Sequence, residues 1–182
     1  MRQFIAAAVL ISSVSMTTPV HAIGDLIGGD INFKGTVVAQ ACSIIPSSKN
    51  IAVDFKEIST DILYRDGRSS PQPFVIELQN CSTRVLNSIT VTFSGAENIN
   101  LPGHLAITPL STGSASGIGI GFEENDGTAI LLNEPSKVVT ITDSKMKLNF
   151  KAFVEGEPDA LSNRALQTGA FRATANYTLN YQ

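Results

Sequence analysis

The sequence predicts an all-β fold, an antiparallel β-sandwich of the immunoglobulin-like class, and three observations support this prediction. Short runs in which apolar and polar residues alternate recur along the chain, and Gly, Pro, Asn and Ser separate them. Helical periodicity is scarce, so the pattern lacks the alternation of strands and helices that builds parallel sheets. Of the 182 residues, 43% are hydrophobic and 16% are charged, which favours a folded core over a disordered chain.

The first 22 residues predict export across a membrane. Arg2 precedes an apolar run from Phe4 to Val14, and a polar stretch then ends in Val20-His21-Ala22. Because a membrane helix needs about 20 apolar residues, this run indicates a signal peptide cleaved after Ala22. We expect the exported chain to be residues 23–182, without a later segment that could span a bilayer.

The two cysteines, Cys42 and Cys81, predict a disulfide. Export to an oxidising compartment favours pairing of an even number of cysteines. Zinc binding is the weaker alternative, because the exported chain has no Cys-x-x-Cys motif and contains a single histidine, His104. We therefore expect neither a metal nor another cofactor.

The predicted strands follow one another at short intervals within one domain, residues 39–182, which shows no internal repeat. Each is a short alternating or β-branched run bounded by turn residues, and Asn125-Asp126-Gly127 predicts a hairpin turn between the fourth and fifth. In chain order they are Ile51 to Phe55, Phe74 to Leu78, Ile89 to Phe93, Gly117 to Phe122, Ala129 to Leu132, Val138 to Ile141, Lys147 to Val154 and Phe171 to Tyr181.

The last predicted strand has nothing after it to pair with. In an immunoglobulin-like sandwich a further strand lies beside it, and without that strand the domain is left with an apolar groove and an open sheet edge. Taken alone, the segment also fits an ordinary core strand that does not border a groove. Its apolar face contains Phe171, Ala173, Ala175, Tyr177, Leu179 and Tyr181, and Gln182 follows.

The N-terminal extension, residues 23–38, carries a second alternating run before the domain. Its alternate positions are Gly29, Ile31, Phe33, Gly35 and Val37. A spare strand at one end and an unfilled groove at the other predict head-to-tail polymerisation, in which each copy adds a strand to the next.

Three stretches of the sequence resemble one known family over the whole chain. They are FKGTVVAQAC from Phe33 to Cys42, LQNC from Leu78 to Cys81, and GAFRATANYTLNYQ from Gly169 to Gln182. The last stretch has a glycine fourteen residues from the end and a penultimate tyrosine, here Gly169 and Tyr181. In these features the chain resembles the structural pilin subunits of chaperone/usher fimbriae of the type 1 and P pilus kind.

The resemblance implies an incomplete immunoglobulin-like fold that lacks its last strand and is completed by donor-strand exchange. A periplasmic chaperone would lend a strand, and at an outer-membrane usher the extension of the next pilin subunit would replace it. The resulting fimbria would stand on the cell surface and support adhesion.

The resemblance also assigns roles to residues at both ends. Gly35, seven positions before Cys42, matches the glycine of the donor strand, where the groove is too narrow for a side chain. Ile31, Phe33 and Val37 would fill pockets, with Val37 where exchange begins, whereas Gly29 replaces what is often a larger residue. The acceptor groove and chaperone contacts would involve Gly169, Phe171, Ala173, Ala175, Tyr177, Leu179, Tyr181 and the carboxylate of Gln182.

Other classes of function lack their residues. No nucleophile motif accompanies His104, which follows Pro102-Gly103 and is interpreted as a surface histidine, so no enzymatic activity is expected. The 13 basic and 16 acidic residues give a pI near 5.3, which argues against nucleic-acid binding. The cluster of Glu123, Glu124 and Asp126 is interpreted as solvated acids, because a calcium loop needs a longer array of oxygen ligands.

Two alternatives to a main structural subunit stay open in the sequence. The chain could be a minor subunit, in a tip fibre or as an adaptor, since pocket shape and partner pairing decide that role. A self-contained secreted carbohydrate-binding domain is the other alternative, and it would need no donor strand.

Overall fold

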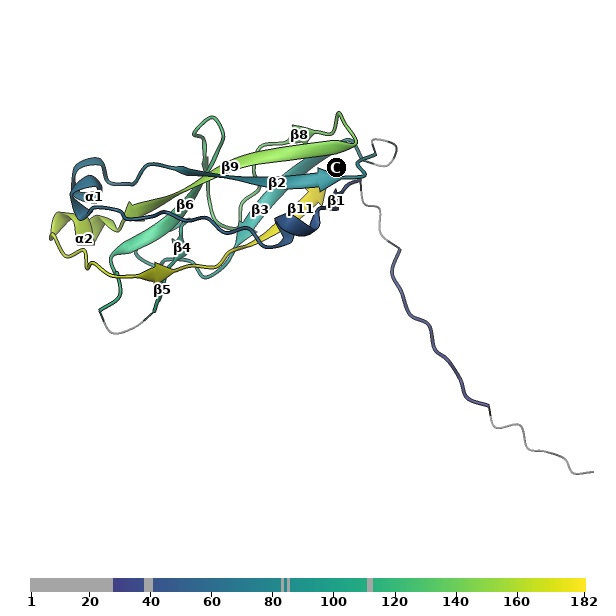
Figure 1. Cartoon of the computed structure of the whole chain (residues 1–182), viewed down its shortest axis with the longest axis horizontal. Helices are drawn as coiled ribbons and strands as arrows, with labels where there is room; N and C mark the ends of the chain where they lie inside the picture. Colours follow the sequence, from purple (N-terminus) through teal and green to yellow (C-terminus); the bar gives the residue numbers. More distant parts are fainter. Residues whose placement is uncertain (1–27, 38–40, 83, 85, 111–112) are drawn as a thin grey trace, which may run out of the picture. The chain divides into compact units, whose positions relative to one another are not determined.

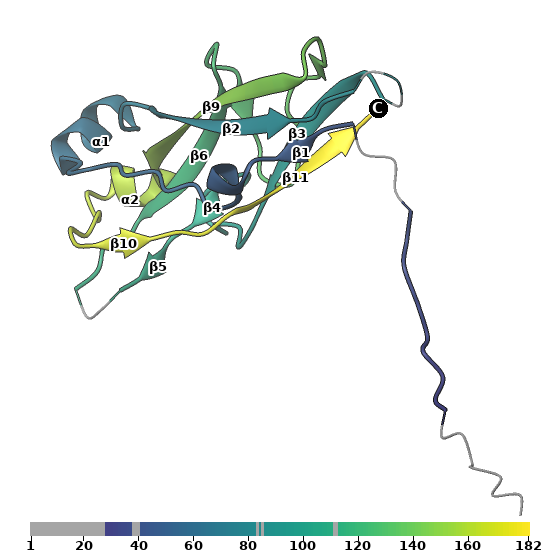
Figure 2. The ribbon, with the colours of Figure 1, turned by 45° about the vertical axis from the view of Figure 1, so that its right-hand side comes forward.

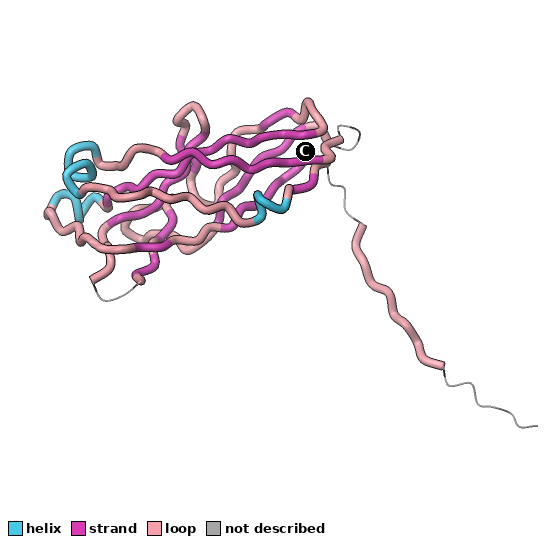
Figure 3. The backbone as a smooth tube through the Cα atoms, viewed as in Figure 1, coloured by secondary structure: helices cyan, strands magenta, loops and turns pink. Residues whose placement is uncertain are grey.

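The computed structural model describes residues 28–37, 41–82, 84, 86–110 and 113–182. The predicted signal peptide, residues 1–22, lies outside the described residues. Residues 1–36 and 37–182 form two units, and in the first of them residues 28–36 are exposed and adopt no helix or strand. Most of the regular secondary structure in the folded unit is strand, drawn in magenta in Figure 3, with loops in pink between the strands.

The larger of the sheets in the described part of the chain has six strands. Five of them lie in the order β1, β2, β9, β6, β4. The sixth, β7, pairs with the part of β6 that β4 does not reach, and all pairs are antiparallel. The strands are β1 (Ser43–Ile44), β2 (Gln72–Gln79), β4 (Leu105–Ala106), β6 (Ile118–Glu124), β7 (Ala129–Ile130) and β9 (Lys145–Gly156).

A second sheet faces the first, and a two-stranded ladder continues from it (Figures 1 and 2). The second sheet has the order β11, β3, β8, and β10 pairs with β5. The strands are β3 (Ser88–Ser94), β5 (Thr108–Pro109), β8 (Val139–Thr140), β10 (Phe171–Arg172) and β11 (Asn176–Tyr181).

The core lies between these two sheets and contains a cluster of phenylalanines. Phe93 of β3 stacks on Phe122 of β6, with ring centroids 4.6 Å apart, and meets Phe150 of β9 edge-on at 5.2 Å. Phe74 of β2 completes the cluster. Burying side chains of this size stabilises a fold by roughly 1.5–3 kcal/mol each, so this cluster joins the two sheets firmly.

Most of the predicted strands are confirmed, and with them the β-sandwich. The predicted runs at 74–78, 89–93 and 147–154 lie inside β2, β3 and β9. The predicted hairpin after residue 122 is also present, because Phe122 of β6 pairs with Ile130 of β7.

The prediction of a strand from Ile51 to Phe55 is wrong. This segment is extended, but it forms no ladder with any described strand. Its alternation nevertheless reflects burial, since Ile51, Val53 and Phe55 are half-buried against the core while Ala52 is exposed. The side-chain pattern is that of a strand, and the backbone partner is missing.

The single strand predicted from Phe171 to Tyr181 is divided into β10 and β11 by residues 173–175. The chain changes partner there, from β5 to β3. Gly95, just after β3, lies at this change: a Cβ atom on it would be 3.1 Å from the Thr174 oxygen and would overlap Leu105. The close approach of two backbones explains the glycine.

The short helices are not apparent from the sequence pattern. In α1 (Thr60–Asp66) the Ser59 hydroxyl accepts a hydrogen bond from the Asp61 amide, and Gly67 ends the helix in the left-handed region, at φ 78°. α2 (Pro158–Ser162) starts with a proline, and η1 (Pro46–Lys49) is a 3₁₀ turn. Helices of seven residues or fewer are too short to show helical periodicity.

Two predictions about polar residues also need correction. Glu123 and Glu124 are buried rather than solvated, because β6 lies inside the sheet; Glu123 pairs with Arg68 at 3.1 Å, and only Asp126 of that cluster is exposed. His104 is not a free surface histidine. Its side chain is mostly covered, and its Nε2 atom lies 3.1 Å from Glu155.

Candidate functional site

An open apolar groove of about 830 Å³ runs along the folded unit. One wall is the extended segment 51–56, and the other is the C-terminal segment 169–177. Core residues of both sheets form the floor: Phe74, Phe93, Leu105, Ile120, Phe122 and Ala152. A groove this apolar exposes to water side chains that a further strand could cover.

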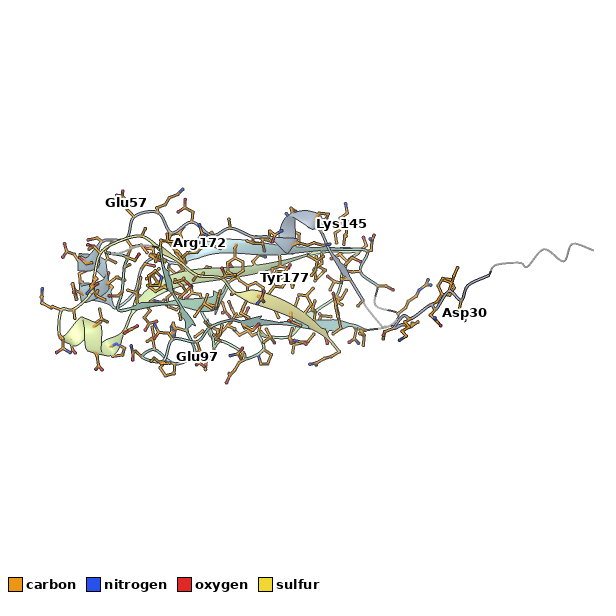
Figure 4. The ribbon with its side chains drawn as sticks, turned by 90° about the horizontal axis from the view of Figure 1, so that it is seen from below. Asp30, Glu57, Glu97, Lys145, Arg172 and Tyr177 are labelled. Atoms are coloured by element: carbon orange, nitrogen blue, oxygen red, sulfur yellow. A yellow bond between two sulfur atoms is a disulfide. The ribbon has the colours of Figure 1, made fainter. Side chains whose placement is uncertain are left out.

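The C-terminal wall is an open sheet edge. β11 pairs with β3 along one edge, with Tyr177 opposite Phe93, and no described strand pairs with its other edge. Figure 4 labels Arg172 and Tyr177 on this segment. The opposite wall, segment 51–56, likewise has no ladder partner among the residues described. Two extended segments with unpaired backbone groups therefore border the groove.

The residues predicted on the acceptor face do share one face. Burial alternates strictly from residue 171 to 181, and the odd-numbered residues are half-buried and pack against the core. The groove itself is shorter than predicted. Phe171, Ala173, Ala175 and Tyr177 line it, whereas Leu179 and Tyr181 do not.

Two tyrosine hydroxyls explain where the groove ends. Tyr177 donates a hydrogen bond of 2.6 Å to the Ser48 carbonyl in η1, and Tyr181 donates one of 3.0 Å to the Cys42 carbonyl. Partial burial raises the pKa of Tyr177 above its ordinary value, because the charged phenolate loses contact with water. These two bonds join β11 to the beginning of the opposite wall.

A smaller cavity of about 240 Å³ lies beside α1 and borders the other end of the groove. Gly169 and Phe171 line both spaces. The Phe171 ring lies 6.3 Å from the Phe55 ring of the opposite wall, measured between centroids. An aromatic pair from the two walls thus lies near the passage between groove and cavity.

Gly169 occupies a position that excludes any side chain. Its φ of 152° is rare for other residues, and a Cβ atom would lie 2.7 Å from the Ser114 carbonyl carbon and 2.8 Å from the Ala115 nitrogen. The glycine lets the chain pass the 113–115 backbone just before β10. This gives a physical reason for the residue that the sequence resemblance singled out.

The C-terminal residue Gln182 is held by β3. Its amide donates to the Ser88 oxygen, and its own main-chain oxygen accepts from the Asn87 and Ser88 amides at 3.0 and 3.1 Å. The end of β11 is therefore fixed by backbone hydrogen bonds.

The predicted disulfide between Cys42 and Cys81 is confirmed. It joins the chain just before β1 to the residue two positions beyond β2, and Cys42 is buried. The bond anchors the segment that leads into the first wall, close to the hydroxyl of Tyr181.

Charges lie at the rim of the groove rather than on its floor. The Lys56 ammonium group contacts Asp54 at 2.7 Å, and this hydrogen bond keeps the pKa of Asp54 below its ordinary value. In the described ranges no three His, Cys, Asp or Glu residues gather as metal ligands would, and no helix is long and apolar enough to cross a membrane. The arrangement suits binding of an apolar, extended chain.

The five residues predicted to form a donor strand lie in the segment 28–37. The side chains of Ile31 and Phe33 are 77% and 89% exposed, and that of Val37 is fully exposed. Space surrounds Gly29 and Gly35, with no atom within 4 Å of an added Cβ. Apolar side chains this exposed are unfavourable in water, and they form a second surface that could gain from burial.

Comparisons with known proteins agree on one family. A family model described as "Fimbrial protein" matches residues 31–182. The chain is 36% identical over 182 residues to the "Putative minor fimbrial subunit PmfF" of Proteus mirabilis, covering all of both chains. It is 34% identical over 165 residues to the "Fimbrial adapter PapK" of Escherichia coli, covering 87% of this chain and 91% of that protein.

Solved structures are similar in fold. One describes a chaperone–usher pilus and the basis of rod uncoiling; it is 26% identical, with a TM-score of 0.66, and covers 91% of this chain and all of that one. The P pilus rod subunit PapA, at 24% identity and a TM-score of 0.67, covers 79% of this chain and all of its own, and it shows the fold alone. With the open-edged sandwich and the matching family model, these relatives establish that the chain belongs to the fimbrial protein family, the pilin subunits of chaperone–usher fimbriae.

Proposed function

We propose that the chain is a structural subunit that polymerises head to tail by donor-strand exchange, and that residues 29–37 of one copy enter the groove of the next. The observation that carries the proposal is the apolar groove, which lies between two extended walls without ladder partners in the described part of the chain. The exposed alternating run at 29–37 is a strand of the right character to fill it.

Two gains favour this exchange. Burying Ile31, Phe33 and Val37 would contribute roughly 1.5–3 kcal/mol for each side chain. Ordering the backbone opposes this by about 1–2 kcal/mol per residue, so the side chains alone are insufficient. The added strand would also satisfy unpaired backbone groups along the wall segment 169–177, and this second gain would make the complete sandwich stable.

The two cavities suggest how the donor would lie. As the last strand of an antiparallel sandwich, it would run opposite to β10 and β11. Val37 would then enter the small cavity beside Phe171, and Gly35 would pass the aromatic pair formed by Phe55 and Phe171. Ile31 and Phe33 would fill the larger groove.

Before polymerisation, an open groove needs protection from aggregation. A periplasmic chaperone that lends a strand, and an outer-membrane usher that replaces it, would provide this on the route to the cell surface. Basic chaperone residues would grip the terminal carboxylate of Gln182, whose main chain β3 already holds in a fixed place.

A minor or adaptor position in the fimbria is the second candidate. The relatives named as a minor subunit and an adapter favour it. In that position the donor and groove would engage different subunits, whereas a main subunit would engage copies of itself.

Polymer formation by the exported chain, residues 23–182, tests the proposal. We expect a concentration-dependent ladder in detergent gels that resists moderate heating, and we expect a synthetic peptide of residues 28–38 to shorten the ladder and raise the melting temperature. A Gly35→Asn peptide should lose most of this effect. A Thr36→Ala peptide, altered at a position of the opposite face, should keep it.

The outcomes separate the candidates. A ladder shows that the groove accepts the donor strand of another copy, as a main subunit requires. An unstable monomer that its own peptide fails to stabilise indicates an adaptor, whose donor and groove engage different subunits. A stable monomer that ignores the peptide would contradict donor-strand exchange and favour a self-contained secreted domain, such as one that binds carbohydrate.

A further inference from the structure

Tyr177 lies at one end of the groove and is hydrogen-bonded to a residue that is itself fixed in place. Its hydroxyl donates to the Ser48 carbonyl in η1, just before the opposite wall, at 2.6 Å. Ser48 is itself buried, and its hydroxyl accepts a hydrogen bond of 2.9 Å from the Glu77 amide in β2. The Tyr177 side chain is therefore held by η1, the turn that precedes segment 51–56, and η1 is itself hydrogen-bonded to β2.

The side chains along this wall change abruptly in size. The small residues Ala173 and Ala175 line the groove beside its phenylalanine floor, and the next residue on the same face that lines it is the large Tyr177. Leu179, the next residue on the same face, no longer lines the groove. A strand lying in the groove would therefore meet small side chains in the middle and a large one at Tyr177.

The side chains of the proposed donor strand, residues 29–37, vary in size in a complementary way. In an antiparallel pair, each step of two residues back along the donor is a step of two forward along the wall. With Gly35 level with Phe171, as proposed above, Phe33 lies level with Ala173 and Gly29 lies level with Tyr177. The two largest donor side chains, Phe33 and Ile31, thus lie level with the two alanines, and the residue without a side chain lies level with the tyrosine.

We propose that Tyr177 is a specificity-determining residue: by filling the end of the groove it selects donor strands with glycine at the outermost position, as in Gly29 of a second copy of this chain. This inference rests on the proposed donor-strand exchange and adds a rule for the choice of partner. A larger outermost residue would have to displace the tyrosine ring and break its bond to Ser48.

The test compares peptides as inhibitors of ladder formation by the exported chain. The probes are the peptide of residues 28–38 and its Gly29→Leu variant, and the readout is the concentration that halves polymer formation. In the chain with unaltered Tyr177, we expect the half-inhibitory concentration of the Gly29→Leu peptide to be about tenfold higher than that of the original peptide, because the leucine overfills a packed site. An Asp30→Asn peptide, altered on the other face, should match the original within twofold.

Acceptor variants show whether Tyr177 causes the preference. In Tyr177→Ala the two peptides should differ by less than twofold, because the end of the groove is open. Tyr177→Phe keeps the ring and loses only the hydroxyl bond, so it serves as a second variant should the alanine variant misfold. Its preference for the original peptide over the Gly29→Leu peptide should fall to about threefold, because the ring becomes free to turn.

The results distinguish this rule from the proposed function. If both peptides inhibit equally in the unaltered chain, or if the preference survives in both Tyr177 variants, the selectivity inference is overturned while donor-strand exchange stands. If no peptide of the series inhibits or binds, both are overturned.

Discussion

The rings of Phe55 and Phe171 lie 6.3 Å apart and belong to the two opposite walls of the groove. Phe171 also lines the smaller cavity, so a strand that reaches from groove to cavity must pass this pair. A backbone without a side chain passes most easily, which gives a reason within this molecule for Gly35.

When Phe55 is replaced by a smaller residue, the space beside Phe171 should accept donor peptides that carry a side chain at position 35. For the unaltered acceptor we expect a Gly35→Ala peptide to bind about tenfold more weakly than the original peptide, because one added methyl group overfills the passage. The acceptor variant Phe55→Ala should bind both peptides within threefold, as measured by inhibition of laddering. Phe55→Leu, which keeps most of the bulk, should retain the preference; equal losses in all three acceptors would contradict the assignment.

Gly169→Ala should destabilise the fold by roughly 2–3 kcal/mol, since it adds both backbone strain and an overlap with the 113–115 backbone. Urea unfolding of the exported chain measures this. Gly127→Ala is the matched control: its φ is also positive, at 88°, but nothing lies within 4 Å, so a loss of about 1 kcal/mol from strain alone is expected. Equal losses in the two variants would show that the overlap relaxes without cost.

Features that depend on local pattern were predictable from the sequence. The alternation from Phe171 to Tyr181 placed these residues on one face because side chains of an extended chain alternate regardless of partners. The disulfide followed from the cysteine count and the predicted export. The ends of α1 were also readable in principle, from Ser59 before it and Gly67 after it.

Features that depend on distant partners were not predictable. The segment from Ile51 to Phe55 has a strand pattern, but a strand requires a neighbouring backbone, and the described part of the chain supplies none there. The interruption at 173–175 arises because the chain exchanges one partner strand for another. The end of the groove depends on the bond between Tyr177 and Ser48, which are 129 positions apart and share no sequence signal.

Loss of the disulfide should lower the free energy of unfolding by about 4 kcal/mol, the value for a closed loop of this length in the chain-entropy model. The two cysteines are 39 positions apart. Comparing urea midpoints of the exported chain with and without reductant measures the effect, and a Cys42→Ser/Cys81→Ser double variant should match the reduced protein. Reductant should leave that double variant unchanged; a shift there would show an effect unrelated to the bond.

Removal of the Tyr177 hydroxyl should have an effect on stability that depends on pH. At neutral pH, Tyr177→Phe should lose about 0.5–1.5 kcal/mol, the net contribution of one hydrogen bond. The pKa of Tyr177 is raised above its ordinary value of 10.0 because burial disfavours the phenolate. The folded protein therefore holds this proton more tightly than the unfolded chain does. The contribution of Tyr177 to stability is accordingly complete below pH 10.0 and is lost as the pH rises through the folded-state pKa.

The difference between the original chain and Tyr177→Phe should thus shrink once the pH exceeds 10.0. Urea unfolding of both proteins at pH 7 and at several alkaline values measures it, and because the lysines titrate equally in both, their contribution cancels in the comparison. A Tyr64→Phe variant serves as a second reference, since the Tyr64 hydroxyl accepts from the Leu166 amide away from the groove. A difference for Tyr177 that stays constant up to pH 11 would mean that the phenol is solvated in the folded state, and that the ring does not seal the end of the groove.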